Sequence, residues 1–135
     1  MKPILVVDDE PIVRDSIKDW LQEVGYQVAT AGTGDEALAM IEKQDFSVMI
    51  LDVRLPGKSG VTVLRETKAL KPDIKAIMIT AYPTKELATE LQSLGTIDYL
   101  IKPIFPKEPE NLIRFHYNSS ELDSQSRERI YASLD

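Results

Sequence analysis

Four short apolar runs in this chain end at polar residues that could do chemistry. Asp8-Asp9 follow the first run, Asp52 the second, Thr80 the third and Lys102-Pro103 the last. Carboxylates that are held close together raise one another's pKa unless a cation compensates their charge. Mg²⁺ suits such a set, because it typically binds one or two carboxylates together with water and phosphate oxygens. The residue types therefore indicate a site for a divalent cation and a phosphoryl group.

These residues can act together only if the chain forms an open parallel sheet. The runs at 4–7, 46–51, 76–79 and 99–101 have the length and composition of buried strands, and a weaker run lies around 26–30. Segments with a helical spacing of apolar residues alternate with these runs. We expect an α/β fold with a doubly wound five-stranded parallel sheet, in which the residues that follow the strands meet at one edge.

Each of these polar residues also has an ordinary structural explanation. Asp8-Asp9 could cap the first helix, because acids are favoured at a helix N-terminus. Asp52 could belong to a turn at a strand end, Thr80 could be a structural strand threonine, and Lys102 could be a solvated lysine. Taken singly, these alternatives stay open. Their joint occurrence at four strand ends, in one order along the chain, favours a functional site.

The same motifs resemble those of the receiver domains of two-component response regulators. The resemblance covers residues 3 to about 105 and rests on four runs, which are ILVV followed by Asp8-Asp9, MILDVRLPGKSG, MITAY and DYLIKP. It implies the flavodoxin-like strand order 2-1-3-4-5. It also implies that an acidic pair after the first strand holds Mg²⁺ and that an aspartate after the third strand accepts a phosphoryl group.

Residue by residue, the resemblance assigns Asp52 as the phosphoacceptor. Mg²⁺ would be held by Asp8, Asp9, Asp52 and the backbone carbonyl of Arg54. Phosphoryl transfer to a carboxylate nucleophile needs in-line positioning and neutralisation of the charge on the transferring oxygens. Mg²⁺ would supply the first neutralising charge and Lys102 the second.

A second group of residues is expected to respond to the phosphoryl group. Thr80 would donate a hydrogen bond to it, and Tyr99 would occupy the space that Thr80 leaves, so that the two side chains form a switch. Arg54 and Tyr82 lie two positions after the phosphoacceptor and the threonine, and both are expected to tune dephosphorylation by restricting the access of water. We also expect a cis peptide bond at Lys102-Pro103.

Composition limits the other functions that this chain could have. The 135 residues include no cysteine, which excludes a disulfide framework and a thiolate metal site. A formal net charge of −6 argues against direct binding to nucleic acid or to an anionic membrane surface. No stretch approaches the roughly 20 apolar residues of a membrane span, and the apolar run near the N-terminus is too short for a signal peptide. We expect a cytoplasmic protein.

The chain changes character after the fifth predicted strand. We expect residues 1–105 to form the receiver core through that strand, and residues 106–135 to form a divergent helical tail or linker. Pro109 suits the first turn of a helix. A second helical stretch is predicted around 121–134. His116, the single histidine of the sequence, is expected to have a surface or packing role.

The predicted function is a signalling switch that is controlled by phosphorylation. Its partners would be a histidine kinase or phosphotransfer protein, and a downstream effector protein or a covalent output domain. A homodimer could form through the fourth helix, the fifth strand and the helix at Pro109. Two alternatives are a metal-dependent phosphohydrolase with an aspartate nucleophile and a protein-binding module without phosphorylation. Stoichiometry separates them, because a switch takes up one phosphoryl group and loses it slowly, whereas a hydrolase turns over.

Overall fold

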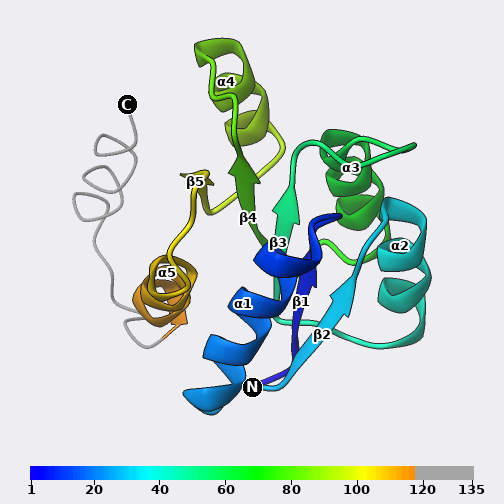
Figure 1. Cartoon of the computed structure of the whole chain (residues 1–135). Helices are drawn as coiled ribbons and strands as arrows, with labels where there is room; N and C mark the ends of the chain where they lie inside the picture. Colours follow the sequence, from blue (N-terminus) through cyan, green and yellow to red (C-terminus); the bar gives the residue numbers. More distant parts are fainter. Residues whose placement is uncertain (118–135) are drawn as a thin grey trace.

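Five parallel strands alternate with five helices in residues 1–117, the part of the chain that the computed structural model describes (Figure 1). The strands are β1 (Ile4–Val7), β2 (Val28–Ala31), β3 (Val48–Asp52), β4 (Lys75–Thr80) and β5 (Asp98–Ile101). The helices are α1 (Pro11–Glu23), α2 (Gly34–Lys43), α3 (Gly60–Leu70), α4 (Lys85–Ser93) and α5 (Lys107–Tyr117). The order β2-β1-β3-β4-β5 confirms the prediction. The helical stretch predicted around 121–134 lies outside the described residues.

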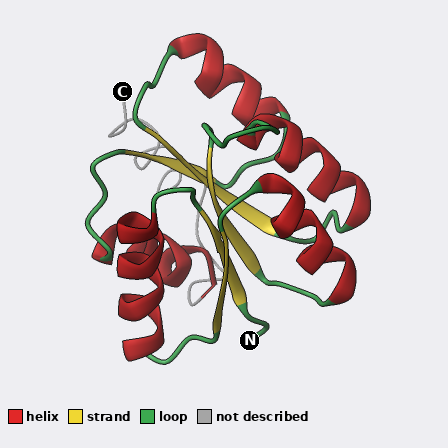
Figure 2. Ribbon diagram, turned by 45° about the vertical axis from the view of Figure 1, so that its right-hand side comes forward, coloured by secondary structure: helices red, strands yellow, loops and turns green. Residues whose placement is uncertain are grey.

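The sheet has a helical layer on each face (Figure 2). Alternate side chains of a strand point to opposite faces, so β1 places Leu5 and Val7 in a core with α2, α3 and α4. Its other residues, Ile4 and Val6, lie in a second core with α1 and α5. Because both faces are covered, the central strands are apolar throughout, which is the pattern that the sequence shows. None of the helices in the described part of the chain is long and apolar enough to cross a membrane.

Strand β2 begins two residues later than the apolar run around 26–30 suggests. The backbone N–H of Tyr26 donates to the carbonyl of Leu21, 3.0 Å away, and therefore still belongs to the end of α1. Gly25 makes this ending possible, because its φ of 106° is costly for any other residue. Strand β5, by contrast, begins one residue earlier than predicted, at Asp98.

Helix α5 begins at Lys107, directly after Pro106, and contains Pro109 in its first turn as predicted. A proline is tolerated there because its missing N–H would have no partner within the helix. Leu112 and Ile113 are buried in the same core as the apolar side chains of α1. The helix after the fifth strand therefore packs on the sheet.

A hydrogen bond between side chains also joins α5 to α1. Trp20 donates from Nε1 to Oε1 of Glu110, 2.7 Å away, and Arg114 bonds to the other carboxylate oxygen of Glu110. Glu110 is buried, and the two donors compensate the cost of removing its charge from water. Trp20 is about one-third exposed, so it faces α5 on one side and solvent on the other.

The start of α1 differs from the other helix starts. Thr33, Ser59 and Thr84 each accept a hydrogen bond from the backbone three residues ahead and so cap α2, α3 and α4. In α1 the capping position is held by Glu10, whose side chain makes no such bond, and Pro11 is the first helical residue. The carboxylate of Glu10 is therefore left to interact elsewhere.

Helix α3 begins in close contact with the end of β3. A β-carbon on Gly60 would lie 2.1 Å from the backbone carbonyl oxygen of Asp52, far inside van der Waals contact. The Gly60 N–H donates to the carbonyl of Val53 at 2.8 Å, which ties the helix to the strand end. Only glycine fits this approach, and it fixes the loop that surrounds Asp52.

Candidate functional site

The residues predicted from the four strand ends meet at the carboxyl edge of the sheet. Asp8 and Asp9 follow β1, Asp52 ends β3, Thr80 ends β4 and Lys102 follows β5. The backbone N–H of Lys102 donates to the carbonyl of Thr80 at 2.8 Å, and its ammonium donates to Oδ2 of Asp52 at 2.8 Å. The peptide bond between Lys102 and the following proline is cis, as predicted.

The ammonium of Lys102 lies among three carboxylates. Its Nζ is 2.8 Å from Oδ2 of Asp52, 2.7 Å from Oε1 of Glu10 and 3.2 Å from Oδ2 of Asp8. Burial alone would lower the pKa of Lys102, but the hydrogen bonds to Asp52 and Glu10 and the nearby negative charges outweigh it. The pKa of Lys102 therefore lies above its ordinary value. The side chain is charged throughout the physiological range.

Among the carboxylates of this cluster, Asp8 is the one whose pKa is raised by burial. It is fully buried, and removal from water raises its pKa. The N–H of Glu10, which donates to Oδ1 of Asp8 at 2.8 Å, lowers the pKa, while the charge of Asp52 raises it and Lys102 lowers it. The net direction is upward. A further positive charge beside Asp8 would therefore stabilise its ionised form.

Four carboxylates at this edge fit a divalent cation. Oxygen atoms of Asp8, Asp9, Glu10 and Asp52 all lie within 4.8 Å of one another. Oδ2 of Asp8 is buried and has no hydrogen-bond partner in the described residues, although it faces Lys102 as an ion pair. An all-oxygen set with a buried, incompletely bonded carboxylate is suited to a hard cation such as Mg²⁺. Asp9 and Glu10 are exposed, which leaves one side of the set open to solvent.

The structural alternatives for the three aspartates are only partly supported. Neither Asp8 nor Asp9 caps α1, because the capping position belongs to Glu10. Asp52 does form a local turn, since its Oδ1 accepts a hydrogen bond from the N–H of Arg54 at 3.0 Å. Its other oxygen is the one that contacts Lys102. Asp52 therefore forms a local turn with one carboxylate oxygen and belongs to the charged cluster through the other.

Thr80 and Tyr99 lie on neighbouring strands and on the same face of the sheet. In the register of β4 and β5, Tyr99 pairs with Met78, and Thr80 follows Met78 by two residues. Thr80 is buried and its hydroxyl accepts a hydrogen bond from the N–H of Tyr82 at 3.0 Å. Tyr99 is buried in the core beneath α4. The two predicted switch residues therefore lie at diagonal positions on one face of adjacent strands.

Arg54 and Tyr82, the residues predicted to tune dephosphorylation, contact each other. The guanidinium carbon of Arg54 lies 4.3 Å from the centre of the Tyr82 ring, a cation–π geometry. Their backbones are each bonded to a site residue, Arg54 to Asp52 and Tyr82 to Thr80. The contact between the two side chains thus joins the loops that follow β3 and β4. The ring of Tyr82 is well exposed.

Glu10 is the site residue that the sequence interpretation missed. The available signal was the continuous acidic run Asp8-Asp9-Glu10 before Pro11. His116, for which a surface or packing role was expected, lies near the end of α5. It is buried in α5 and its ring meets that of Phe115 edge to face, with 5.3 Å between the ring centres.

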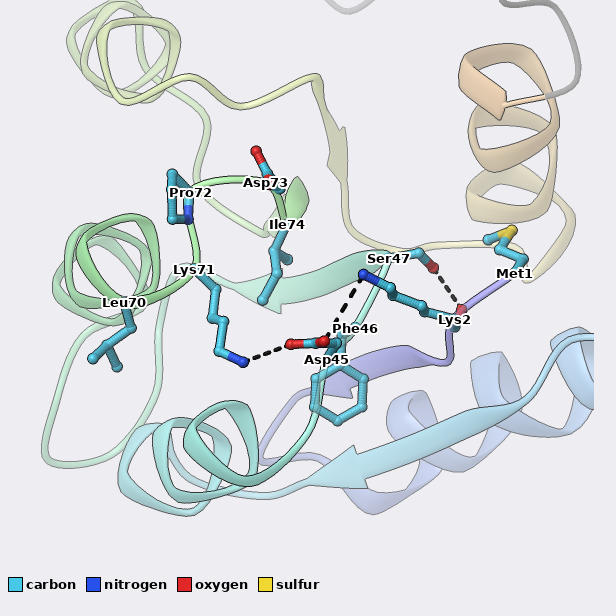
Figure 3. A pocket seen from close by; sticks show the side chains of 10 residues that line it. All are labelled: Met1, Lys2, Asp45, Phe46, Ser47, Leu70, Lys71, Pro72, Asp73 and Ile74. Atoms are coloured by element: carbon cyan, nitrogen blue, oxygen red, sulfur yellow. Dashed lines mark hydrogen bonds and ion pairs between the residues drawn. The ribbon is translucent and has the colours of Figure 1, made fainter.

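A cavity of about 660 Å³ lies at the opposite, amino edge of the sheet (Figure 3). Figure 3 shows Lys71 and Lys2 both directed at the carboxylate of Asp45, with Nζ distances of 2.5 and 3.9 Å. One carboxylate thus faces two ammonium groups. The cavity contains none of the residues of the carboxyl edge, so the charged cluster and this cavity are separate features.

The sequence matches the family model of the response regulator receiver domain over residues 4–114. The chain belongs to this family. Receiver domains of two-component response regulators are phosphorylation-dependent signalling switches, and they bind Mg²⁺ at the phosphorylation site. They interact with histidine kinases and with output domains.

Individual proteins of known structure or function agree with this assignment. A receiver domain protein of Methanospirillum hungatei has a TM-score of 0.84 and 34% identity, covering 90% of this chain and 97% of the other. Response regulator TrrA of Thermotoga maritima, solved in complex with Mg²⁺-BeF, has a TM-score of 0.74 and 38% identity, covering 84% and 97%.

Among curated relatives, the transcriptional regulatory protein ZraR of Escherichia coli is 40% identical over 105 residues. The alignment covers 75% of this receiver domain and 23% of ZraR. The chain thus spans about a quarter of the length of that relative. Receiver domains of similar size to this one also occur among the solved structures.

Proposed function

We propose that Asp52 accepts a phosphoryl group from a phosphohistidine of a histidine kinase or phosphotransfer protein. The observation that carries this proposal is the direct contact of Asp52 with Lys102, beside the buried carboxylate of Asp8. Among the carboxylates of the cluster, Asp52 lies at the end of a central strand and is held by both Lys102 and the N–H of Arg54. This fixed orientation suits in-line attack.

The transfer requires one bond to form and one to break. A carboxylate oxygen of Asp52 forms a bond to phosphorus while the phosphorus–nitrogen bond of the phosphohistidine breaks. The bonding electron pair stays on the imidazole nitrogen of the donor. Lys102 stays protonated, because its raised pKa keeps the ammonium charged, and it binds the phosphoryl oxygens by charge and hydrogen bonds.

Mg²⁺ would be held by Asp8, Asp9, Asp52 and the backbone carbonyl of Arg54. When bound, the ion neutralises charge that develops on the transferring oxygens. Asp8 and Asp52 provide the buried carboxylates of this set, and Asp9 provides an exposed one. The cation would also offset the mutual repulsion of these acids.

The response to phosphorylation would start at Thr80. Its hydroxyl now accepts a hydrogen bond from the N–H of Tyr82, and rotation of the side chain toward the site would let its O–H donate to a phosphoryl oxygen. Movement of Thr80 changes the space beside Tyr99 on the same face of the sheet. Because β5 is an edge strand, a change at Tyr99 reaches the face formed by α4, β5 and α5, where a second copy, an effector protein or a covalent output domain could bind.

Two exposed apolar side chains support docking of the donor at the carboxyl edge. Ile12 is the second residue of α1, and Phe105 lies in the loop between Lys102 and α5. They are 86% and 72% exposed. Both lie in segments that follow strand ends at the carboxyl edge, Ile12 after β1 and Phe105 after β5. A donor that covers both would bring its phosphohistidine to the site.

Intact mass spectrometry after treatment with acetyl phosphate and Mg²⁺ tests the proposed function. We expect one added phosphoryl group in the parent and none in Asp52→Asn. As a matched control, Asp45→Asn should be modified like the parent, because Asp45 lies at the amino edge. Equal phosphorylation of Asp52→Asn, or continuous turnover of acetyl phosphate at a high rate, would contradict the proposal.

A further inference from the structure

The Lys102 ammonium faces three carboxylates, with hydrogen bonds to Glu10 and Asp52 and an ion pair with Asp8. A lysine ammonium has three N–H donors. Nζ has three carboxylate neighbours within 3.2 Å, belonging to Asp8, Glu10 and Asp52. A phosphoryl group on Asp52 must therefore compete with these carboxylates for the ammonium of Lys102.

The three carboxylates differ in how easily they can leave. The side chains of Asp8 and Asp52 are 0% and 4% exposed, so removing either from Lys102 would leave a buried charge without its partner. The side chain of Glu10 is 58% exposed and can turn into water. Glu10 is thus the contact of lowest cost to break.

The backbone of Glu10 stays in place while its side chain turns. Its N–H donates to Oδ1 of Asp8 at 2.8 Å, and its carbonyl accepts from the N–H of Arg14 at 3.0 Å. Pro11 restricts the chain directly after it. The side chain itself makes no capping bond, and in the described part of the chain its hydrogen-bond partner is Lys102.

We propose that Glu10 is a positioning residue that occupies, before phosphorylation, the place on Lys102 that the phosphoryl group takes afterwards. It holds the ammonium beside Asp52 and is then displaced by the incoming anion. Glu10 therefore competes with the phosphoryl group and lowers the affinity of the site for it. This inference rests on the proposed phosphorylation of Asp52.

Beryllofluoride mimics a phosphoryl group on an aspartate. Calorimetric titration of the full chain with beryllofluoride, at saturating Mg²⁺, tests the inference. Glu10→Gln removes the charge at nearly constant shape. Glu10→Asp keeps the charge but shortens the side chain, and an aspartate at this position can cap α1 instead of reaching Lys102. Both variants should bind beryllofluoride about two- to fivefold more tightly than the parent, as expected for losing an exposed ion pair.

Asp15→Asn is the matched control for the general effect of negative charge. Asp15 lies on α1 with a similar exposure of 53% and does not contact Lys102. Its variant should bind beryllofluoride like the parent. If Glu10→Asp matches the parent while Glu10→Gln binds more tightly, only charge matters and the competition is refuted. Unchanged binding in both Glu10 variants would also refute it.

Failure of this inference can be separated from failure of the proposed function. The parent should bind beryllofluoride and Asp52→Asn should not. If the parent does not bind, or if Asp52→Asn binds equally well, the assignment of Asp52 is wrong. If that comparison holds and only the Glu10 variants behave like the parent, the phosphorylation site stands and the role of Glu10 is refuted.

Discussion

Arg54 and Tyr82 contact each other although they follow different strands. The contact suggests that they act as one cover over the site, so removing either side chain should open it. A cation–π pair at an exposed position contributes about 0.5–1 kcal/mol, which corresponds to about a two- to fivefold change in rate. We expect Arg54→Ala and Tyr82→Ala each to speed loss of the phosphoryl group by about this factor.

The double variant should lose the phosphoryl group faster than the parent but little faster than either single variant. Tyr82→Phe keeps the ring that Arg54 contacts and should decay at the parent rate. Phosphate release measured after removal of the phosphodonor provides the rates. Unchanged decay in the double variant would show that neither side chain restricts water, and fully additive effects would show that the two act separately.

Burial of the Asp98 carboxyl group predicts that the stability of the folded protein depends on pH. It is completely buried at the start of β5, and burial raises its pKa to about 7, although the N–H of Tyr99 donates to it and lowers the pKa. An acid whose pKa is raised by folding binds more protons when folded. Its contribution to stability is therefore greatest below its unfolded pKa and is lost as pH rises toward 7.

Asp98→Asn should therefore stabilise the protein at pH 8 more than at pH 4, on the order of 2–4 kcal/mol at the higher pH. Asparagine can still accept the hydrogen bond from Tyr99. Chemical denaturation at the two pH values measures the difference. Asp19→Asn, at an exposed position of α1, should have little effect at either pH. A uniform effect of Asp98→Asn at both values would contradict the raised pKa.

The positions of Asp8, Asp52, Thr80 and Lys102 were predictable because each follows or ends an apolar run. A parallel sheet brings such positions together whatever the details of packing. The role of Glu10 was not predictable in the same way. Its contact with Lys102 depends on an uncapped helix start and on the direction of one long side chain, and neither leaves a periodic pattern in the sequence.

Among the elements, the contact of α3 with the end of β3 is the tightest constraint near the site. Gly60→Ala would force a β-carbon toward the backbone of Asp52 and should destabilise the protein by about 1–3 kcal/mol. Because the strain falls on Asp52, beryllofluoride binding should weaken as well. Chemical denaturation and calorimetry measure the two effects.

Gly57→Ala is a useful comparison. Gly57 has a φ of 78° but open space around it, so its variant should lose stability through the backbone alone and keep more of its beryllofluoride affinity. If Gly60→Ala binds beryllofluoride as well as Gly57→Ala does, the close approach does not position Asp52.

The elements themselves were predicted well where burial dominates and less well at their ends. Apolar runs identified the five strands, because both faces of the sheet are covered. The run around 26–30 misplaced the start of β2, since Tyr26 is apolar enough to resemble a strand residue but its N–H completes the end of α1. Hydrogen bonding at a helix end is decided by the fold around it, and hydrophobicity alone does not indicate it.

For the whole molecule, β2 and β5 are the two edge strands of the sheet, and the face formed by α4, β5 and α5 is the one that contains Tyr99. We expect phosphorylation to strengthen a homodimer through this face, and a difference of about 1–3 kcal/mol between the two states would be sufficient. Light scattering with and without beryllofluoride, on the full chain and on a chain ending at Asn118, measures the effect. Identical monomer masses in all four samples would refute phosphorylation-linked dimerisation, and a dimer that survives shortening would exclude the tail as its main contact.

The bond between Trp20 and Glu110 gives the molecule an optical probe. Trp20 is the single tryptophan of the sequence, so all indole emission comes from the junction of α1 and α5. The indole N–H donates to the buried carboxylate of Glu110. Detachment of α5 would break this bond and expose the whole indole to water. The wavelength of the emission maximum therefore reports whether α5 is docked on α1, and it does not require a probe at Asp52. An unlabelled sample can thus show whether a partner or a phosphodonor loosens α5.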